Sequence, residues 1–347
     1  MDWMNVWRAG AIAGLLGAAC SAGAAGQRPA PLPDAASQNM QTIVNLAVLP
    51  IEAQWQERDH GGLEASFKSL CGASERFSDG QPKIMIYESA LNHYFGAWNA
   101  WDAYPRQLQE WRTQYPDSLA QALAETMYWS AYAWKARGGG YAHRVPQEAW
   151  QLFHERMAMA SARLEESKAL SNSCPLWHSL RIANLMETGA PRAVIEAAYK
   201  QAVAAFPFDL QIHAQMARVY SPRWGGSARE FDAFARRAAA ITRSAEGQGM
   251  YARLYWGEDC NCDSAPPFAS DGTGPEWKVM KAGFEDLLKR YPNSTWNANK
   301  FASFACRAND KETYLKLRTA LQGAVYEALW PASYSMDVCD RRFGKPA

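Results

Sequence analysis

The sequence predicts an all-α protein, a tetratricopeptide-like α-solenoid of degenerate helix pairs. Apolar residues recur at helical spacing from about residue 38 to residue 323, whereas strand-like alternation is scarce and "KIMIY" at 83–87 is the only extended candidate. An aromatic–proline pair followed by polar residues also recurs along this stretch, which indicates repeated helical units. Hydrophobic residues make up 48% of the 347 residues, enough for a large core.

Residues 1–25 are predicted to form a signal peptide. Arg8 precedes the small, apolar run "AGAIAGLLGAAC", which is too short for a membrane-spanning helix. Two processing outcomes compete. Cleavage could follow the small residues Ala22–Ala24, or lipid could be attached to Cys20, because "LLGAAC" resembles a bacterial lipobox. Gly17 occupies the position where a lipobox usually has leucine, so the lipid alternative departs from that pattern.

The rest of the chain divides into three parts. Residues 26–37 form a Pro/Ala-rich linker without a core-forming pattern, 38–330 form the helical-repeat domain, and 331–347 form a C-terminal tail. The predicted signal places the protein in the periplasm or outside the cell, or on a membrane as a lipoprotein. The net charge of +1, without a basic stripe or polybasic cluster, argues against nucleic acid, and against membrane contact other than a lipid anchor.

The cysteine count supports export. Besides Cys20 the chain has six cysteines, and an even number in an exported chain indicates disulfides. Six cysteines allow fifteen pairings, and some could instead be buried thiols. We expect Cys306 to pair with Cys339, tying the tail to the last helix pair. The other disulfide candidates are Cys71, Cys174, Cys260 and Cys262.

The repeat consists of a helix, a proline turn and a second helix. The aromatic–proline pairs are "YPDS" at 115–118, "FPFD" at 206–209 and "YPNS" at 291–294, with "CPLW" at 174–177 as a variant. At five, eight and twelve residues before each of Pro116, Pro207 and Pro292, apolar side chains share one helical face. Proline disfavours helical geometry in the residue before it, and the Asp or Ser that follows can cap the next helix.

The stretch "VYSPRWGGSAREFDAFA" at 219–235 predicts a sharp reversal between two helices. Gly225 and Gly226 permit positive φ values, and Ser227 with Glu230 forms a capping box. The turn itself does not require Arg223 or Trp224. Either Trp224 fills a gap between helix pairs while Arg223 pairs with a carboxylate, or both lie on the concave face and contact a ligand.

The stretch "WKARGGGYAHRVPQEAW" at 134–150 has the same organisation. Arg137 ends a helix rich in Trp and Tyr, three glycines turn the chain, and Pro146 opens the next helix. Glycine-rich turns before helices can bind phosphate. Here no strand precedes the glycines and no G-K-[ST] follows them, so the pattern does not favour a nucleotide site.

The segments "SPRWGGSAREFDAFA", "WKARGGGYA" and "GFEDLLKRYPNSTWNANKFASFACRAND" resemble a family of exported or membrane-anchored bacterial proteins with tetratricopeptide-like helix pairs. The resemblance extends from about Asp117 to Trp330, and its most specific parts are "PRWGGS" at 222–227 and the run from Tyr291 to Cys306. It leaves the chain before residue 60 and the loop at 257–274 uncovered. It implies an all-α fold without an assigned biochemical function, and it supplies no catalytic residues.

The sequence contains no recognisable catalytic motif. It lacks H-E-x-x-H and G-x-S-x-G, and its six histidines are scattered. Cys260 and Cys262 in "EDCNCD" could offer two thiolates to a soft metal, but a zinc site needs about four ligands. Disulfide bonding is the favoured fate of these thiols, so we expect neither a metal nor another cofactor.

These observations favour a binding or scaffolding protein of the cell envelope that recognises a protein or peptide partner. Stacked helix pairs form concave surfaces, and aromatic and arginine side chains suit recognition of a partner. The alternatives are a hydrolase acting on peptidoglycan or glycan and a purely structural helical domain. The candidate binding residues are Trp129, Arg137, Tyr141, Arg223 and Trp224.

Overall fold

The computed structural model describes residues 40–71, 75–97, 101–258, 268, 274–321 and 324–344. These residues form α-helices and short 3₁₀ helices, without a strand among them. This confirms the predicted all-α helical-repeat fold. The signal peptide, the linker, Cys20, Cys260 and Cys262 lie outside the described residues.

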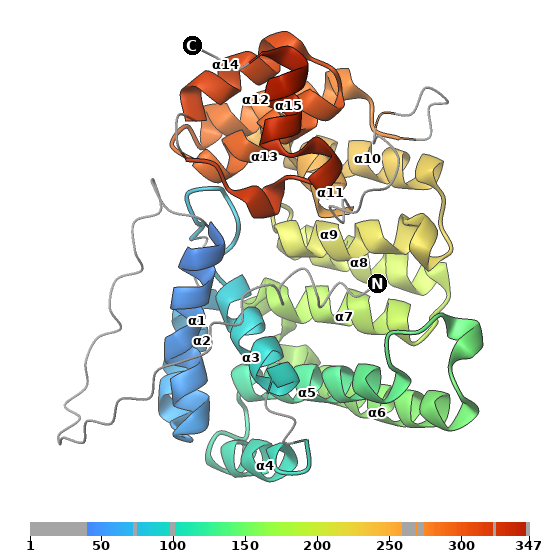
Figure 1. Ribbon diagram of the computed structural model, residues 1–347. Coiled ribbons are helices and arrows are strands. Elements are labelled where there is room, and N and C mark those ends of the chain that lie inside the picture. Colours follow the sequence, from blue (N-terminus) through green and yellow to red (C-terminus); the bar gives the residue numbers. More distant parts are fainter. Residues whose placement is uncertain are drawn as a thin grey trace, which may run out of the picture.

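Ten of the helices form five consecutive pairs, each packed along its partner and on the neighbouring pair. Figure 1 shows these pairs stacked from α5 and α6 up to α13 and α14. Their bounds are α5 Leu119–Arg137, α6 Gln147–Glu166, α7 Pro175–Glu187, α8 Arg192–Ala205, α9 Leu210–Tyr220, α10 Ala228–Glu246, α11 Gly249–Glu258, α12 Trp277–Arg290, α13 Thr295–Arg307 and α14 Lys311–Leu321.

The proline turns between these helices are confirmed. Pro116 lies in the short turn between α4 (Tyr104–Gln114) and α5. Pro207 and Pro292 lie in the turns α8–α9 and α12–α13. The Ser or Asp two residues after each proline accepts a hydrogen bond from a backbone N–H in the first turn of the next helix. Of the nine residues that form the helical faces before the prolines, eight are buried as expected and Tyr199 is half-buried.

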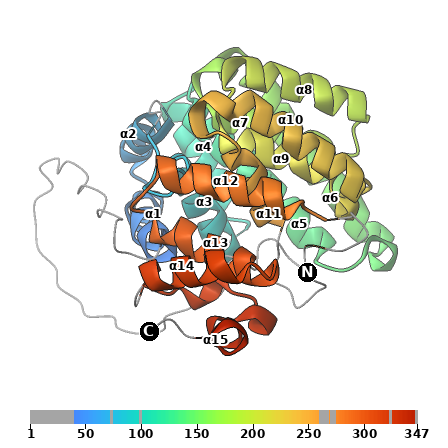
Figure 2. The same ribbon diagram turned by 90° about the horizontal axis from the view of Figure 1, so that it is seen from above.

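Four helices precede the stack: α1 Met40–Gln56, α2 His60–Cys71, α3 Met85–Ala97 and α4 Tyr104–Gln114. Helices α1 and α2 stand across the stacked pairs in Figure 1, and α3 packs on α1 and α5. Figure 2 shows the same arrangement from above.

The prediction of an extended piece at 83–87 is wrong, because α3 begins at Met85. Residues 84–87 are all buried, and a short apolar run cannot distinguish a strand from an enclosed helix.

The segment between α2 and α3 reaches far along the stack. The carbonyl oxygen of Asp79 accepts hydrogen bonds from Arg253 Nη2 (2.6 Å) on α11 and Asn297 Nδ2 (3.1 Å) on α13. Arg76 Nη2 donates to the Phe208 carbonyl (2.6 Å) just before α9. One short segment therefore ties the first helices to three later helix pairs.

Two disulfides fasten the two ends of the described chain. Cys306 pairs with Cys339, which confirms the expected link, and Cys71 pairs with Cys174 at the start of α7. Residues 331–344, for which the sequence predicts a tail, include α15 Met336–Phe343. Tyr314 on α14 donates to Asp340 (2.5 Å), and Cys339 and Phe343 are buried. The segment thus packs as part of the last helical layer.

None of the helices in the described residues combines the length and the apolarity needed to cross a membrane.

The buried apolar side chains form two large clusters. One cluster joins α1–α5 with the start of α7, and the other runs from the end of α7 to α15. Trp296 on α13 packs against both clusters, so the core is nearly continuous along the stack.

Candidate functional site

The structure brings two of the five candidate residues together through a third side chain. Arg137, at the end of α5, places its guanidinium 5.0 Å from the ring centres of both Trp134 and Trp150. Trp224 meets the same Trp134 ring edge to face, with centroids 6.2 Å apart. Arg137 and Trp224 are far apart in the sequence, and they belong to one site because α5 and α9 end on the same side of the stack (Figure 1).

An ion pair completes this site. Arg218, in the last turn of α9, lies over the Trp224 ring at 5.1 Å and pairs with Glu187 at the end of α7 at 3.6 Å. Both charged side chains are mostly buried, with exposed fractions of 18% and 11%. We name the group the Trp134 cluster, and it consists of Trp134, Arg137, Trp150, Glu187, Arg218 and Trp224.

The three indoles of the Trp134 cluster are half-buried. Trp134 and Trp150 lean edge-on against Phe153, which is fully buried in a small core of its own with Ala133 and Met157. Each ring therefore has one side held by the core and another in contact with solvent. Aromatic and guanidinium groups in such positions lose little conformational freedom when a partner covers them.

The turn after α9 sets the position of Trp224. Trp224 ends the 3₁₀ helix η5 Pro222–Trp224, and Gly225 follows in the left-handed conformation with φ of 84°. A Cβ on Gly226 would lie 2.1 Å from the Tyr220 carbonyl oxygen, so only glycine fits there. Ser227 starts α10 as its N-cap, because its hydroxyl oxygen accepts a hydrogen bond from the Glu230 backbone N–H (3.2 Å) and the same hydroxyl donates to the Glu230 carboxylate (2.8 Å). The serine half of the predicted capping box is therefore present. The predicted reversal is confirmed.

A second carboxyl lies beside this turn. Glu258, at the end of α11, accepts a hydrogen bond from the Ser221 hydroxyl (2.8 Å). Arg218 and Arg223 both act on it electrostatically. The exposed Arg223 therefore acts electrostatically on a nearby carboxyl, and both alternatives for this residue stay predictions.

Burial governs the protonation of both carboxyls. It raises the pKa of Glu187, whereas the Arg218 guanidinium and a hydrogen bond from Trp134 act in the opposite direction. Burial likewise raises the pKa of Glu258, against the Ser221 hydrogen bond and the two arginines. Two carboxyls with raised pKa therefore share one arginine at this edge of the stack.

Two candidate residues lie apart from the cluster. Trp129 is half-buried, and its ring contacts Tyr128 and Tyr132 at the edge of the first core cluster. Tyr141 is 74% exposed, and its ring stacks on His143 in the turn between α5 and α6. Tyr141 thus borders the Trp134 cluster through the turn that follows Arg137, whereas Trp129 packs with a different set of rings.

Sequence reasoning missed Trp134, Trp150, Glu187 and Arg218. One available signal was the position of Trp134, one helical turn before Arg137 on the same face of a predicted helix. Glu187 and Arg218 carried no such signal, because their contact depends on how two successive pairs stack.

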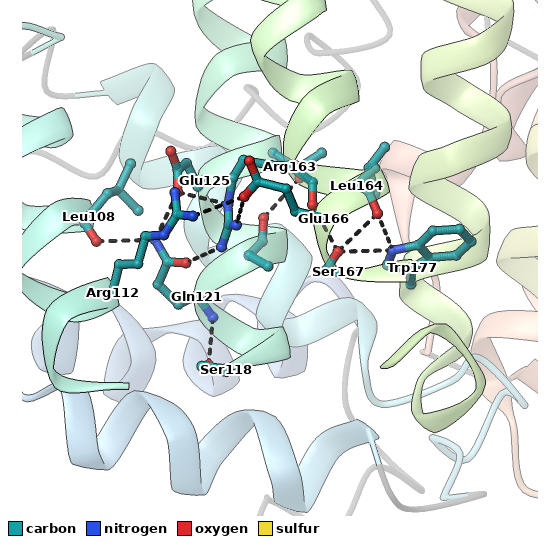
Figure 3. Close-up of polar contacts among 12 residues, drawn as sticks. Leu108, Arg112, Ser118, Gln121, Glu125, Arg163, Leu164, Glu166, Ser167 and Trp177 are labelled. Atoms are coloured by element: carbon teal, nitrogen blue, oxygen red, sulfur yellow. Dashed lines mark hydrogen bonds and ion pairs between the residues drawn. The ribbon is translucent and has the colours of Figure 1, made fainter. Parts of the chain in front are cut away.

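A second arginine-centred group lies on α6 and is shown in Figure 3. Arg163 is 7% exposed and pairs with Glu125 (3.0 Å) and Glu166 (2.5 Å), and it donates to Gln121 (2.7 Å). Gln121 in turn donates to Glu125 and to the Leu108 carbonyl. We call this the Arg163 network. Its charges pair with one another, and it connects α4, α5 and α6.

The described residues contain no group of three or more His, Cys, Asp and Glu side chains placed to hold a metal ion. No family model, curated protein or solved structure matches the chain. The resemblance carried by "PRWGGS" and the binding role of the candidate residues therefore stay predictions.

Proposed function

We propose that this protein is an exported binding or scaffolding module of the cell envelope, and that it recognises a protein or peptide partner through the Trp134 cluster and the neighbouring Tyr141 and Arg223. The observation that carries the proposal is the half-buried state of three indoles with guanidinium groups against their rings at one edge of the stack. Trp, Tyr and Arg are the residues that most often dominate binding energy at protein interfaces.

The preformed geometry supports this role. Trp134 and Trp150 are backed by a fully buried Phe153, and the glycine turn fixes Trp224. A surface that is already ordered loses less entropy on association than a flexible one. Export is supported by the apolar N-terminal run and by two disulfides, which persist in oxidising compartments.

Site-specific crosslinking in the native envelope tests the proposal. A photo-reactive amino acid replaces Tyr141 in one full-length variant and Phe208 in a control. Both side chains are exposed aromatics, at 74% and 42%, but Phe208 lies at the other end of α9. We expect a discrete crosslinked partner from position 141 only. Equal crosslinking from both positions, or none from position 141 in correctly folded protein, would contradict the proposal.

An Arg223→Ala variant separates binding from a structural role. Arg223 is exposed, so its loss should leave the melting temperature within about 1 °C of the natural chain. If Arg223 contacts the partner, crosslinking from position 141 should fall severalfold. A lower melting temperature with unchanged crosslinking would support a purely structural role for this residue.

A hydrolase acting on peptidoglycan or glycan remains the second candidate, and one observation favours it. Glu187 and Glu258 both have raised pKa values and both lie near Arg218, and a carboxyl that keeps its proton can act as a general acid. Glu187→Gln and Glu258→Gln would then abolish release of soluble fragments from purified peptidoglycan. If the natural chain releases none, this candidate is excluded for that substrate.

A further inference from the structure

A pocket of about 190 Å³ that opens to solvent lies between α7, α8 and the 3₁₀ helix η4 Lys168–Ser173, and the residues at its mouth include the exposed Lys168, Val194 and Gln201. We call it the cavity. It shares no residue with the Trp134 cluster. Its walls divide by chemistry into an apolar part and a polar part. The apolar part consists of Trp177, Leu185, Val194, Ala197 and Ala198, and the polar part of Lys168, His178, Arg181 and Gln201.

The cavity exists because α8 contributes small side chains to it. This helix fully buries only Ile195 and Ala202, and the residues it presents to the cavity include Ala197 and Ala198. The Trp177 ring is held in place on the opposite side. Its Nε1 donates to the Leu164 carbonyl (3.2 Å) and to the Ser167 hydroxyl (3.1 Å), as Figure 3 shows. These hydrogen bonds fix the orientation of the Trp177 ring, so this side of the cavity is preformed.

The polar part of the wall is cationic. Lys168 and Arg181 both line the cavity, and both pair with the single carboxylate of Glu165, at 2.7 Å and 3.5 Å. One carboxylate cannot neutralise two cations, so a positive charge is left over at the rim. No acidic residue lines the cavity. An anionic ligand would therefore complement this wall.

His178 supplies a buried polar atom. The residue is 2% exposed, and its Nε2 has no hydrogen-bond partner among the residues that the structure describes. A buried polar atom without a partner costs free energy, which a ligand could recover by forming the missing hydrogen bond. Burial also lowers the pKa of His178 and favours the neutral imidazole, which can either donate or accept.

We propose that this cavity binds a small carboxylate with an apolar body, of about the size of benzoate. An apolar cavity of about 150 Å³ accommodates benzene, so this slightly larger one has room for a ring with a carboxylate. The carboxylate faces Arg181 and Lys168, and the body lies between Trp177 and the α8 alanines.

Calorimetric titration of the full chain with benzoate tests the charge requirement. We expect saturable binding with one site per chain. Benzamide, a neutral ligand of the same shape, should bind at least tenfold more weakly, and benzylamine should show no binding. Equal affinity for benzoate and benzamide, or no saturable benzoate binding by natively folded protein, would overturn the proposal.

Three variants locate the site. Arg181→Met keeps the aliphatic stem and removes the charge, and His178→Phe keeps a ring and removes the nitrogen. Each should weaken benzoate binding at least fivefold. Ala197→Phe fills the cavity and should abolish binding, whereas Ala193→Phe, an exposed residue on α8 outside the cavity, should leave it unchanged. Unchanged binding in Ala197→Phe would place the ligand elsewhere. Crosslinking at position 141 should stay the same in all of them, so this inference and the proposed function can fail separately.

Discussion

The Arg163 network and the Trp134 cluster are both built around arginine, yet they differ in what they leave open. Arg163 is 7% exposed and finds Glu125, Glu166 and Gln121 within the fold. The arginines of the Trp134 cluster lie against indole rings that stay half in solvent, and of these arginines Arg218 also pairs with Glu187. A buried ion must be paired completely, so the first group serves stability. The second keeps apolar and cationic surface available, which suits recognition.

The largest effect is expected at the Arg163 network. Arg163→Met should lower the free energy of unfolding by about 4 kcal/mol, because Glu125 and the Gln121 carbonyl oxygen lose their partner. Arg112→Met is the matched control. Arg112 pairs with the same Glu166, but its side chain is 39% exposed, so the loss should stay below about 1 kcal/mol. Urea unfolding followed by circular dichroism measures both. Similar urea midpoints for Arg163→Met and Arg112→Met would contradict the stabilising role assigned to the Arg163 network.

The turn that positions Trp224 should be the next most sensitive feature. Gly226→Ala places a Cβ against the Tyr220 carbonyl oxygen and should destabilise the fold by about 2–3 kcal/mol. Gly225→Ala meets no atom within 4 Å and strains only the positive φ, which costs about 1 kcal/mol. Thermal unfolding of both variants tests this order. The reverse order would mean that the turn relaxes around Gly226.

Protonation of Glu88 should make the stability depend on pH. Glu88 lies on α3, and burial and the Asp209 carboxylate raise its pKa to about 7, against the attraction of Arg218. Between its ordinary value of 4.5 and about 7, the folded state keeps a proton that the unfolded state has lost. The stability that this group contributes is therefore fully present below pH 4.5 and is lost as the pH rises to about 7, by about 3 kcal/mol.

Glu88→Gln isolates this contribution. In this variant the loss of stability with rising pH that comes from Glu88 should disappear. Glu187 and Glu258 also have raised pKa values, but they are present in both proteins, so their contribution cancels in the comparison. Glu75→Gln serves as the control, because Glu75 is exposed and its hydrogen bond with Lys83 lowers its pKa. Urea unfolding at pH 5 and pH 8 gives the comparison. Parallel pH profiles for Glu88→Gln and the natural chain would contradict the prediction.

The smallest effect on stability is expected at Trp224. Trp224→Ala removes one edge contact with Trp134 and one cation–π contact with Arg218, so unfolding should become easier by about 1 kcal/mol. The buried Trp177→Ala should cost about 4 kcal/mol. Crosslinking from position 141 should show the opposite ranking, with at least a tenfold loss for Trp224→Ala. If Trp224→Ala instead lost as much stability as Trp177→Ala, Trp224 would be a core residue and not a binding residue.

Much of the fold could be predicted because its signals are local. Pro116, Pro207 and Pro292 end helices through their own geometry, and Ser227 with Glu230 caps a helix within four residues. The extended piece at 83–87 was wrong for a local reason as well, since a short apolar run has no period long enough to distinguish strand from helix. At the candidate site, sequence reasoning found Arg137 and Trp224 but not Trp134, which joins them.

The sequence by itself determined the all-α class, the proline and glycine turns, the helix caps and the link between Cys306 and Cys339. Each of these depends on the conformational preferences of a few neighbouring residues or on the proximity of one helix to the next. Only the tertiary structure decided that Arg218 meets Glu187, that Asp79 reaches Arg253 and Asn297, and that α8 leaves a cavity beside His178. Each of these features depends on how separate helices and their connecting segments pack together, and the packing angles are set by the whole core.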